Sequence, residues 1–165
     1  MNMPGADRDQ LRRLAEAVAR VAADPLQAEH DRAWRALNGL RPGARPLVWI
    51  NEIPWGEMAV GDELTLVCTE PSCRAIEERF RRTLYQWRHL RGHMIVEAVY
   101  DCPMVIRDSG FGIRQEGEVH PTGLSGAILS QAFVPQIRTL SDVEKIQRPE
   151  VTVDCDASAR LLEQA

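Results

Sequence analysis

The sequence predicts an α/β fold in which N-terminal helices precede the first strands of a parallel sheet. Residues 47–50 and 94–100 are short, nearly continuous apolar runs, which are typical of strands buried on both faces of a parallel sheet. Between them, residues 69–92 carry apolar side chains at steps of three and four, which indicates an amphipathic helix. The order strand, helix, strand favours a parallel α/β arrangement.

Two helices are expected before the first apolar run. Leucines and valines in residues 11–21 recur at helical spacing. Asp24 and Pro25 then form a typical helix start, with Asp24 as the N-cap and Pro25 at the first helical position. This second helix is expected to end at Asn38 and Gly39, a pair suited to a left-handed C-cap.

The later part of the chain predicts shorter elements. The glycines and mixed apolar residues of 103–120 indicate a hairpin or a twisted excursion. Ser141 and Glu144 match the spacing of a capping box, so a short helix is expected to begin there. Residues 151–153 predict a brief strand, and Asp156 is expected to cap a final helix.

Length and composition fit one globular domain. The 165 residues are 44% hydrophobic and 27% charged, and no linker or repeat divides them, so residues 1–165 are expected to form a single domain. The net charge of −4 provides no basic face for nucleic acid. No apolar run reaches the roughly 18–20 residues that a membrane span requires, so no membrane association is expected.

The cysteines and histidines do not predict a metal site within the chain. The four cysteines are irregularly spaced, and no pair of histidines among His89, His93 and His120 follows a recognised ligand spacing. The N-terminus lacks the apolar core of a signal peptide, so reduced thiols and a cytoplasmic location are expected.

Candidate functional residues follow or interrupt the expected strands, because parallel α/β folds place their sites at the C-terminal ends of strands. Glu52 could act as a general base and Asn51 could donate a hydrogen bond, so these two are the candidate catalytic residues. Trp55 and Glu97 are the candidate ligand-binding residues, one as an aromatic plane and one as a carboxylate.

Each of these residues also has a structural interpretation. Asn51 and Glu52 could simply turn the chain toward Pro54. Glu97 interrupts an apolar run, and a buried carboxylate without a partner is costly, so it is expected to face water or to pair with an arginine.

Several phrases of the sequence resemble a known superfamily in their order and spacing. They are RALNG at residues 35–39, RPLVWINEIPW at residues 45–55 and LYQW at residues 84–87. Together they resemble the opening of the uroporphyrinogen decarboxylase-like superfamily, which contains barrel-shaped decarboxylases and corrinoid-linked methyltransferases. The resemblance implies an incomplete (β/α)₈ TIM-barrel-like fold, the N-terminal portion of a larger barrel, because a complete barrel needs about 250 residues.

The resemblance also implies a carboxylated tetrapyrrole or a corrinoid methyl carrier as a possible substrate. The decarboxylases carry an arginine-rich loop after the first strand, whereas residues 54–58 read PWGEM here. The resemblance therefore favours a corrinoid-linked methyltransferase-type protein over a true uroporphyrinogen decarboxylase. Zinc and a corrinoid would belong to the complete parent enzyme, no cofactor is expected within this chain, and the chain alone is expected to be inactive.

A hypothesis from a different class is a non-catalytic α/β binding or interaction module. An incomplete parallel sheet leaves edge strands that must be paired or covered. A homodimer, or a partner that supplies the missing C-terminal half, is therefore expected.

Overall fold

The computed structural model describes residues 3–58, 61–114, 116–120 and 130–164. Over these ranges the chain combines helices with short strands, so the predicted mixed α/β class is confirmed. The chain divides into two compact units. Unit 1 comprises Met1–Ile53 and Ala59–Tyr100, and unit 2 comprises Pro54–Met58 and Asp101–Ala165.

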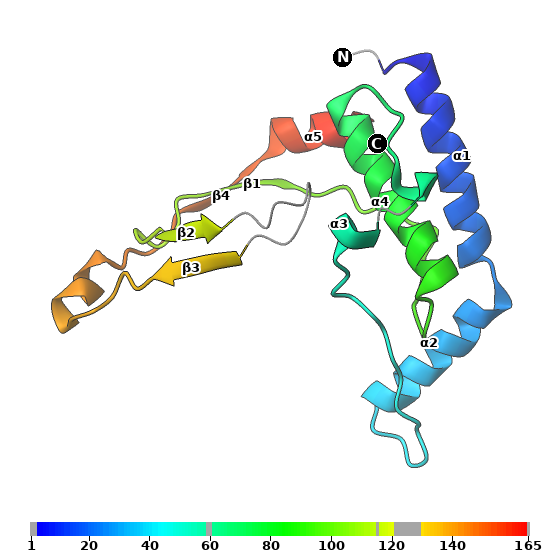
Figure 1. Cartoon of the computed structure of the whole chain (residues 1–165), viewed down its shortest axis with the longest axis horizontal. Coiled ribbons are helices and arrows are strands. Elements are labelled where there is room, and N and C mark those ends of the chain that lie inside the picture. The colour runs from blue at the N-terminus through cyan, green and yellow to red at the C-terminus, as the bar shows by residue number, and fades with distance from the viewer. Residues whose placement is uncertain (1–2, 59–60, 115, 121–129, 165) are drawn as a thin grey trace. The chain divides into compact units, whose positions relative to one another are not determined.

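Unit 1 is built from helices. They are α1 (Gly5–Ala22), α2 (Pro25–Asn38), the 3₁₀ helix η1 (Asp62–Leu64) and α4 (Pro71–His89). Helices α1 and α4 pack side by side (Figure 1). The core consists of two clusters of buried apolar residues, which are Leu11, Cys68, Cys73 and Ile76 in one and Val18, Met94 and Val96 in the other.

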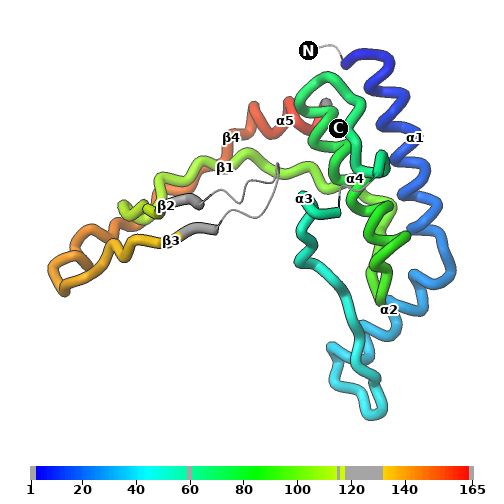
Figure 2. Tube along the Cα trace, viewed as in Figure 1, coloured from blue at the N-terminus to red at the C-terminus, as the bar shows by residue number. Residues whose placement is uncertain are grey.

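Unit 2 contains all the strands of the described residues. In chain order it holds α3 (Trp55–Met58), β1 (Val105–Asp108), β2 (Glu116–His120), β3 (Ser130–Val134), the 3₁₀ helix η2 (Leu140–Lys145), β4 (Val151–Asp154) and α5 (Cys155–Gln164). Strand β1 pairs with β4 and β2 pairs with β3, both antiparallel, in two separate two-stranded sheets. Figure 2 traces β1 beside β4, with α5 following β4 directly. No side chain of this unit whose burial the structure describes is buried.

Two buried carboxylates hold residues 67–70 between α1 and α4. Asp7, which is 3% exposed, accepts two consecutive backbone N–H groups of this segment, each at 2.9 Å. Glu77, which is 0% exposed, accepts two others at 2.9 and 2.8 Å, and Arg81 Nε at 2.8 Å. Since the segment has no regular secondary structure, these side chains satisfy backbone groups that a strand partner would otherwise satisfy.

The two expected parallel strands are not strands in the structure. Residues 47–50 and 94–100 form no ladder, although the N–H of His93 donates one hydrogen bond to the carbonyl oxygen of Val48 at 2.7 Å. Side chains of α2 bind the backbone of the second segment, and the first segment leaves Trp49 41% exposed. The prediction of parallel strands is therefore wrong for both segments, since neither has a continuous backbone neighbour.

Helix α2 begins and ends at the predicted residues, but its C-cap does not have the predicted left-handed conformation. Asp24 caps α2 as predicted, because its carboxylate accepts a backbone N–H at 2.9 Å. The left-handed residue after α2 is Leu40 (φ 50°) and not Gly39 (φ −82°), and a leucine in this conformation costs about 1–2 kcal/mol. Helix α4 ends at His89, three residues before the predicted stop.

In unit 2 the strand predicted at residues 151–153 is confirmed as β4. The prediction of a hairpin within residues 103–120 is wrong, because β1 pairs with the distant β4 and β2 pairs with β3. The capping box is formed by Thr139 and Asp142, which have the same spacing two residues earlier than predicted. The cap of the last helix also lies two residues earlier, because Asp154 rather than Asp156 accepts the backbone N–H of the first turn, at 2.9 Å.

Among the described residues, no helix combines the length and the apolar character that a membrane span needs.

Candidate functional site

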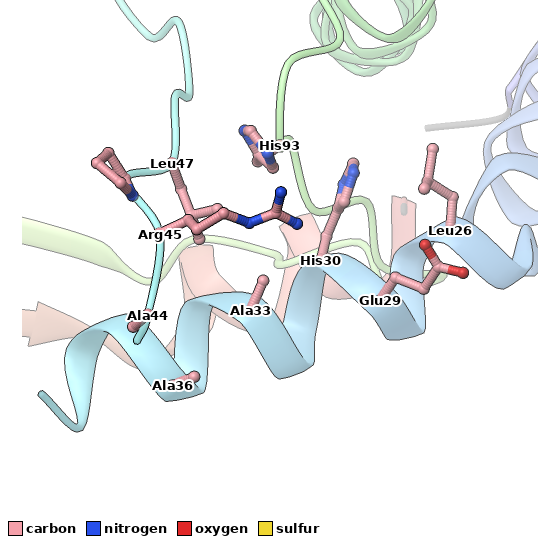
Figure 3. A pocket seen from close by; sticks show the side chains of 10 residues that line it. Leu26, Glu29, His30, Ala33, Ala36, Ala44, Arg45, Leu47 and His93 are labelled. Carbon is pink, nitrogen blue, oxygen red and sulfur yellow. The ribbon is translucent and has the colours of Figure 1, made fainter. Parts of the chain in front are cut away.

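A cavity of about 520 Å³ lies along one face of α2 in unit 1 (Figure 3). This volume falls within the roughly 300–1,000 Å³ of small-molecule sites. Helix α2 lines it with one face between Leu26 and Ala36, the loop after α2 lines it with residues 44–47, and His93 completes the wall. Helix α2 and the loop contribute both small apolar side chains and polar groups to the lining.

The wall at His93 is fixed by three side chains of α2 that hydrogen-bond the backbone of residues 93–96. Gln27, His30 and Trp34 recur at about one helical turn and therefore share a face of α2. Gln27 Oε1 accepts a backbone N–H at 2.9 Å, while His30 Nδ1 and Trp34 Nε1 donate to carbonyl oxygens at 3.0 and 2.8 Å. These contacts hold an extended segment in place without a sheet.

Two imidazole rings meet at the cavity. The ring centroids of His30 and His93 are 5.4 Å apart, and His30 is 6% exposed. His93 is held twice by Val48, because its backbone N–H donates to the Val48 carbonyl at 2.7 Å and its Nδ1 accepts the Val48 N–H at 3.1 Å. In each ring Nδ1 is engaged with backbone, which leaves Nε2 available.

Two opposite charges also line the cavity. Figure 3 shows the Arg45 side chain reaching from the loop toward the two imidazole rings, with Glu29 on the far side of His30. Neither Arg45 nor Glu29 forms a hydrogen bond or an ion pair through its side chain with any residue that the structure describes. Arg45 can therefore bind an anion, and a guanidinium binds carboxylate or phosphate through two parallel hydrogen bonds.

The four residues singled out from the sequence are divided between the two units. Asn51, Glu52 and Glu97 are exposed, and no hydrogen bond or ion pair within the described ranges joins them. Glu97 faces water, which is one of the two alternatives predicted for it. Trp55 is half-buried at the start of α3 and belongs to unit 2, whereas the other three belong to unit 1. Their proposed catalytic and binding roles stay predictions.

The polar residues of the cavity have no clear binding signal in the sequence. His30 is a lone histidine on a largely apolar helix face, and Arg45 opens the phrase RPLVWINEIPW. The spacing of His93 bears only on the question of a metal site. The signal that could have found them is the isolated polar residue at an apolar face, but their convergence depends on contacts across more than 40 residues of sequence.

The buried cysteines are unsuited to chemistry. Cys68 and Cys73 are each 1% exposed, and all four cysteines of the chain are free in the structure. Burial, together with the nearby Glu77 carboxylate, raises the pKa of Cys68 to about 12. Burial, together with Glu70, also raises the pKa of Cys73. Both thiols therefore stay protonated and are poor nucleophiles and poor metal ligands.

The described residues contain no group of three or more histidine, cysteine, aspartate or glutamate side chains that could hold a metal ion. The backbone of His120 lies in β2, but its side chain is outside the described residues.

Comparison of the chain with protein-family models, with curated proteins and with solved structures finds no match in any of the three. A functional hypothesis therefore depends on the sequence phrases and on the cavity along α2.

Proposed function

We propose that the chain is a ligand-binding relative of the uroporphyrinogen decarboxylase-like superfamily, of the corrinoid-linked methyltransferase type and with an incomplete (β/α)₈ barrel architecture. Its cavity along α2 binds a carboxylate-bearing small molecule, and a carboxylated tetrapyrrole belongs to this class. The observation that carries the binding proposal is Arg45, a guanidinium at the cavity without a partner side chain among the described residues.

Three features support this assignment. The phrases RALNG and RPLVWINEIPW border the cavity, since one lies on α2 and the other begins at Arg45. The segments expected as the first two barrel strands lie next to one another at Val48 and His93. The free thiols favour a cytoplasmic location, where cysteines stay reduced.

Replacing Arg45 by methionine is expected to weaken carboxylate binding about tenfold or more, because a hydrogen bond to a charged group contributes about 1.5–3 kcal/mol. Titrations with hexanoate and with a porphyrin tetracarboxylate, followed by tryptophan fluorescence, measure this loss. Trp34 and Trp49 report on the site, since their ring centroids are 6.3 Å apart and Trp34 donates to the backbone of His93.

Arg41→Met is the matched control, because Arg41 is exposed on the same loop and does not line the cavity. If neither probe binds, or if both variants weaken binding equally, the proposed function is wrong.

A second candidate function, an interaction module that pairs with itself, is favoured by the β1–β4 ribbon. Ile106, Val151 and Val153 share one face of this ribbon with Asp108 and are 55%, 58% and 46% exposed. The opposite face carries the ion pair of Arg107 and Asp154, at 2.6 Å. A two-stranded ribbon is marginally stable alone in water, so a second copy covering the apolar face would stabilise it.

Light scattering is expected to give a dimer, with twice the 18.6 kDa of one chain. The paired substitution Ile106→Lys with Val153→Lys should shift the protein to monomer, because it places four charges in the interface of a dimer. Thr152→Lys on the other face is the control and should leave the mass unchanged. A monomeric wild type at all measured concentrations would exclude this candidate.

A further inference from the structure

The two imidazole rings of the cavity have opposite hydrogen-bonding character. A carbonyl oxygen only accepts, so the contact of His30 Nδ1 with the Met94 carbonyl at 3.0 Å places a proton on Nδ1. In the neutral ring, Nε2 of His30 is then an acceptor. His93 Nδ1 accepts the N–H of Val48 at 3.1 Å, so the proton of the neutral His93 ring lies on Nε2, which is a donor.

The two charged residues of the cavity are divided in the same way, with the cation near the donor ring and the anion near the acceptor ring. Arg45 lies on the loop side, with His93 above it in Figure 3, whereas Glu29 lies beyond His30 on α2. Arg45 and His93 therefore make a donor end, and Glu29 and His30 make an acceptor end. The two ends belong to one continuous cavity, and no ion pair between Glu29 and Arg45 closes it among the described side chains.

The cavity also has apolar lining residues. Ala33 on α2 and Leu47 on the loop line it, and neither offers a polar side-chain atom. A chain of methylene groups can lie against these side chains without leaving a buried polar group unsatisfied.

We propose that the cavity selects a small molecule that carries both a carboxylate and a protonated amine separated by an aliphatic chain. This inference rests on the proposed function, since the carboxylate binds Arg45 as described above. The further inference adds a protonated amine on the same ligand, and this amine donates hydrogen bonds to the Glu29 carboxylate and to His30 Nε2. A ligand with only one of the two groups leaves one end of the cavity unpaired.

Three probes with the same carbon chain test the inference, which are 6-aminohexanoate, hexanoate and hexylamine. Their affinities for the full-length protein are measured by chemical-shift titration. 6-Aminohexanoate is expected to bind about fivefold more tightly than hexanoate, since a partly exposed ion pair contributes up to about this factor.

Two variants assign the ends of the ligand. Glu29→Gln should lower the affinity for 6-aminohexanoate to that for hexanoate and leave the affinity for hexanoate unchanged. Arg45→Met should weaken the binding of 6-aminohexanoate and of hexanoate and leave the binding of hexylamine unchanged. Glu16→Gln, on the exposed surface of α1, is the control for the loss of one negative charge and should change none of the affinities. All three sites of substitution are exposed, and circular dichroism checks that the variants are folded.

The outcomes separate the two proposals. Equal affinities of hexanoate and 6-aminohexanoate, both lost in Arg45→Met, would overturn the selectivity for an amine and retain the carboxylate site. Binding of neither probe would overturn both the inference and the proposed function.

Discussion

Replacing Glu77 by glutamine is expected to lower the free energy of unfolding by about 3–5 kcal/mol, because it breaks a buried ion pair by removing one charge. Glu77 is 0% exposed and accepts hydrogen bonds from Arg81 and from the backbone of residues 67–68. A glutamine offers one acceptor oxygen and turns its amide N–H₂ toward donors. Urea denaturation followed by tryptophan fluorescence measures the loss, with Trp87 of α4 as a nearby reporter.

The neighbouring residue provides the control. Glu78 also pairs with an arginine four residues later, but its side chain is 45% exposed. Glu78→Gln is therefore expected to cost less than about 1 kcal/mol, as exposed ion pairs do. Similar losses in the two variants would mean that Glu77 does not hold residues 67–70 in place.

Acid should remove the difference between the wild type and Glu77→Gln. Burial alone would raise the pKa of Glu77, but the Cys68 N–H, the Arg81 guanidinium and the Val67 N–H outweigh it and hold this pKa below its ordinary value near 4.5. A group whose pKa is lowered on folding contributes stability above its unfolded-state pKa, and this contribution is lost as the pH falls through its folded-state pKa. The two proteins should therefore differ in stability at pH 7 and converge in acid below the folded-state pKa. If the difference in unfolding free energy between the two proteins stayed constant with pH, it would contradict an ionised Glu77 in the folded state.

The helices of unit 1 could be predicted because their signals are local. Asp24 and Pro25 mark the start of α2, and the spacing of apolar residues in 69–92 marks α4. The strands could not be predicted in the same way, since an apolar run becomes a strand only if another segment pairs with it. Residues 47–50 have strand composition but one backbone hydrogen bond to residues 93–96, whereas the less apolar β1 finds a full partner in β4.

The residues of the candidate site could not be predicted from local sequence signals either. The rule that sites follow parallel strands selected Asn51, Glu52 and Glu97, and the structure has no parallel strands at these places. His30 lies on the helix α2, but its partner Met94 lies 64 residues away. Sequence patterns therefore predict the helix that lines the cavity, whereas tertiary contacts determine which polar groups face the cavity.

Gly92 directly precedes the backbone segment that the side chains of α2 hold. Gly92→Ala is expected to lower the free energy of unfolding by about 2–3 kcal/mol, from backbone strain together with a steric clash. Gly92 has φ +47°, a conformation that disfavours side chains, and an added Cβ would lie 2.7 Å from the carbonyl oxygen of Val48. That oxygen also accepts the N–H of His93 at 2.7 Å, so relieving the clash must weaken this hydrogen bond.

Gly43→Ala separates the two contributions. Gly43 has φ +79° but no atom within 4 Å of an added Cβ, so its substitution should cost only the strain, about 1 kcal/mol. Both variants are compared by urea denaturation and by titration with hexanoate. Because His93 follows Gly92 directly and forms a wall of the cavity, Gly92→Ala should also weaken hexanoate binding, while Gly43→Ala should not. Equal destabilisation by the two substitutions would show that the close approach of Gly92 to Val48 does not contribute to stability, and unchanged hexanoate binding in Gly92→Ala would show that the cavity does not depend on the position of His93.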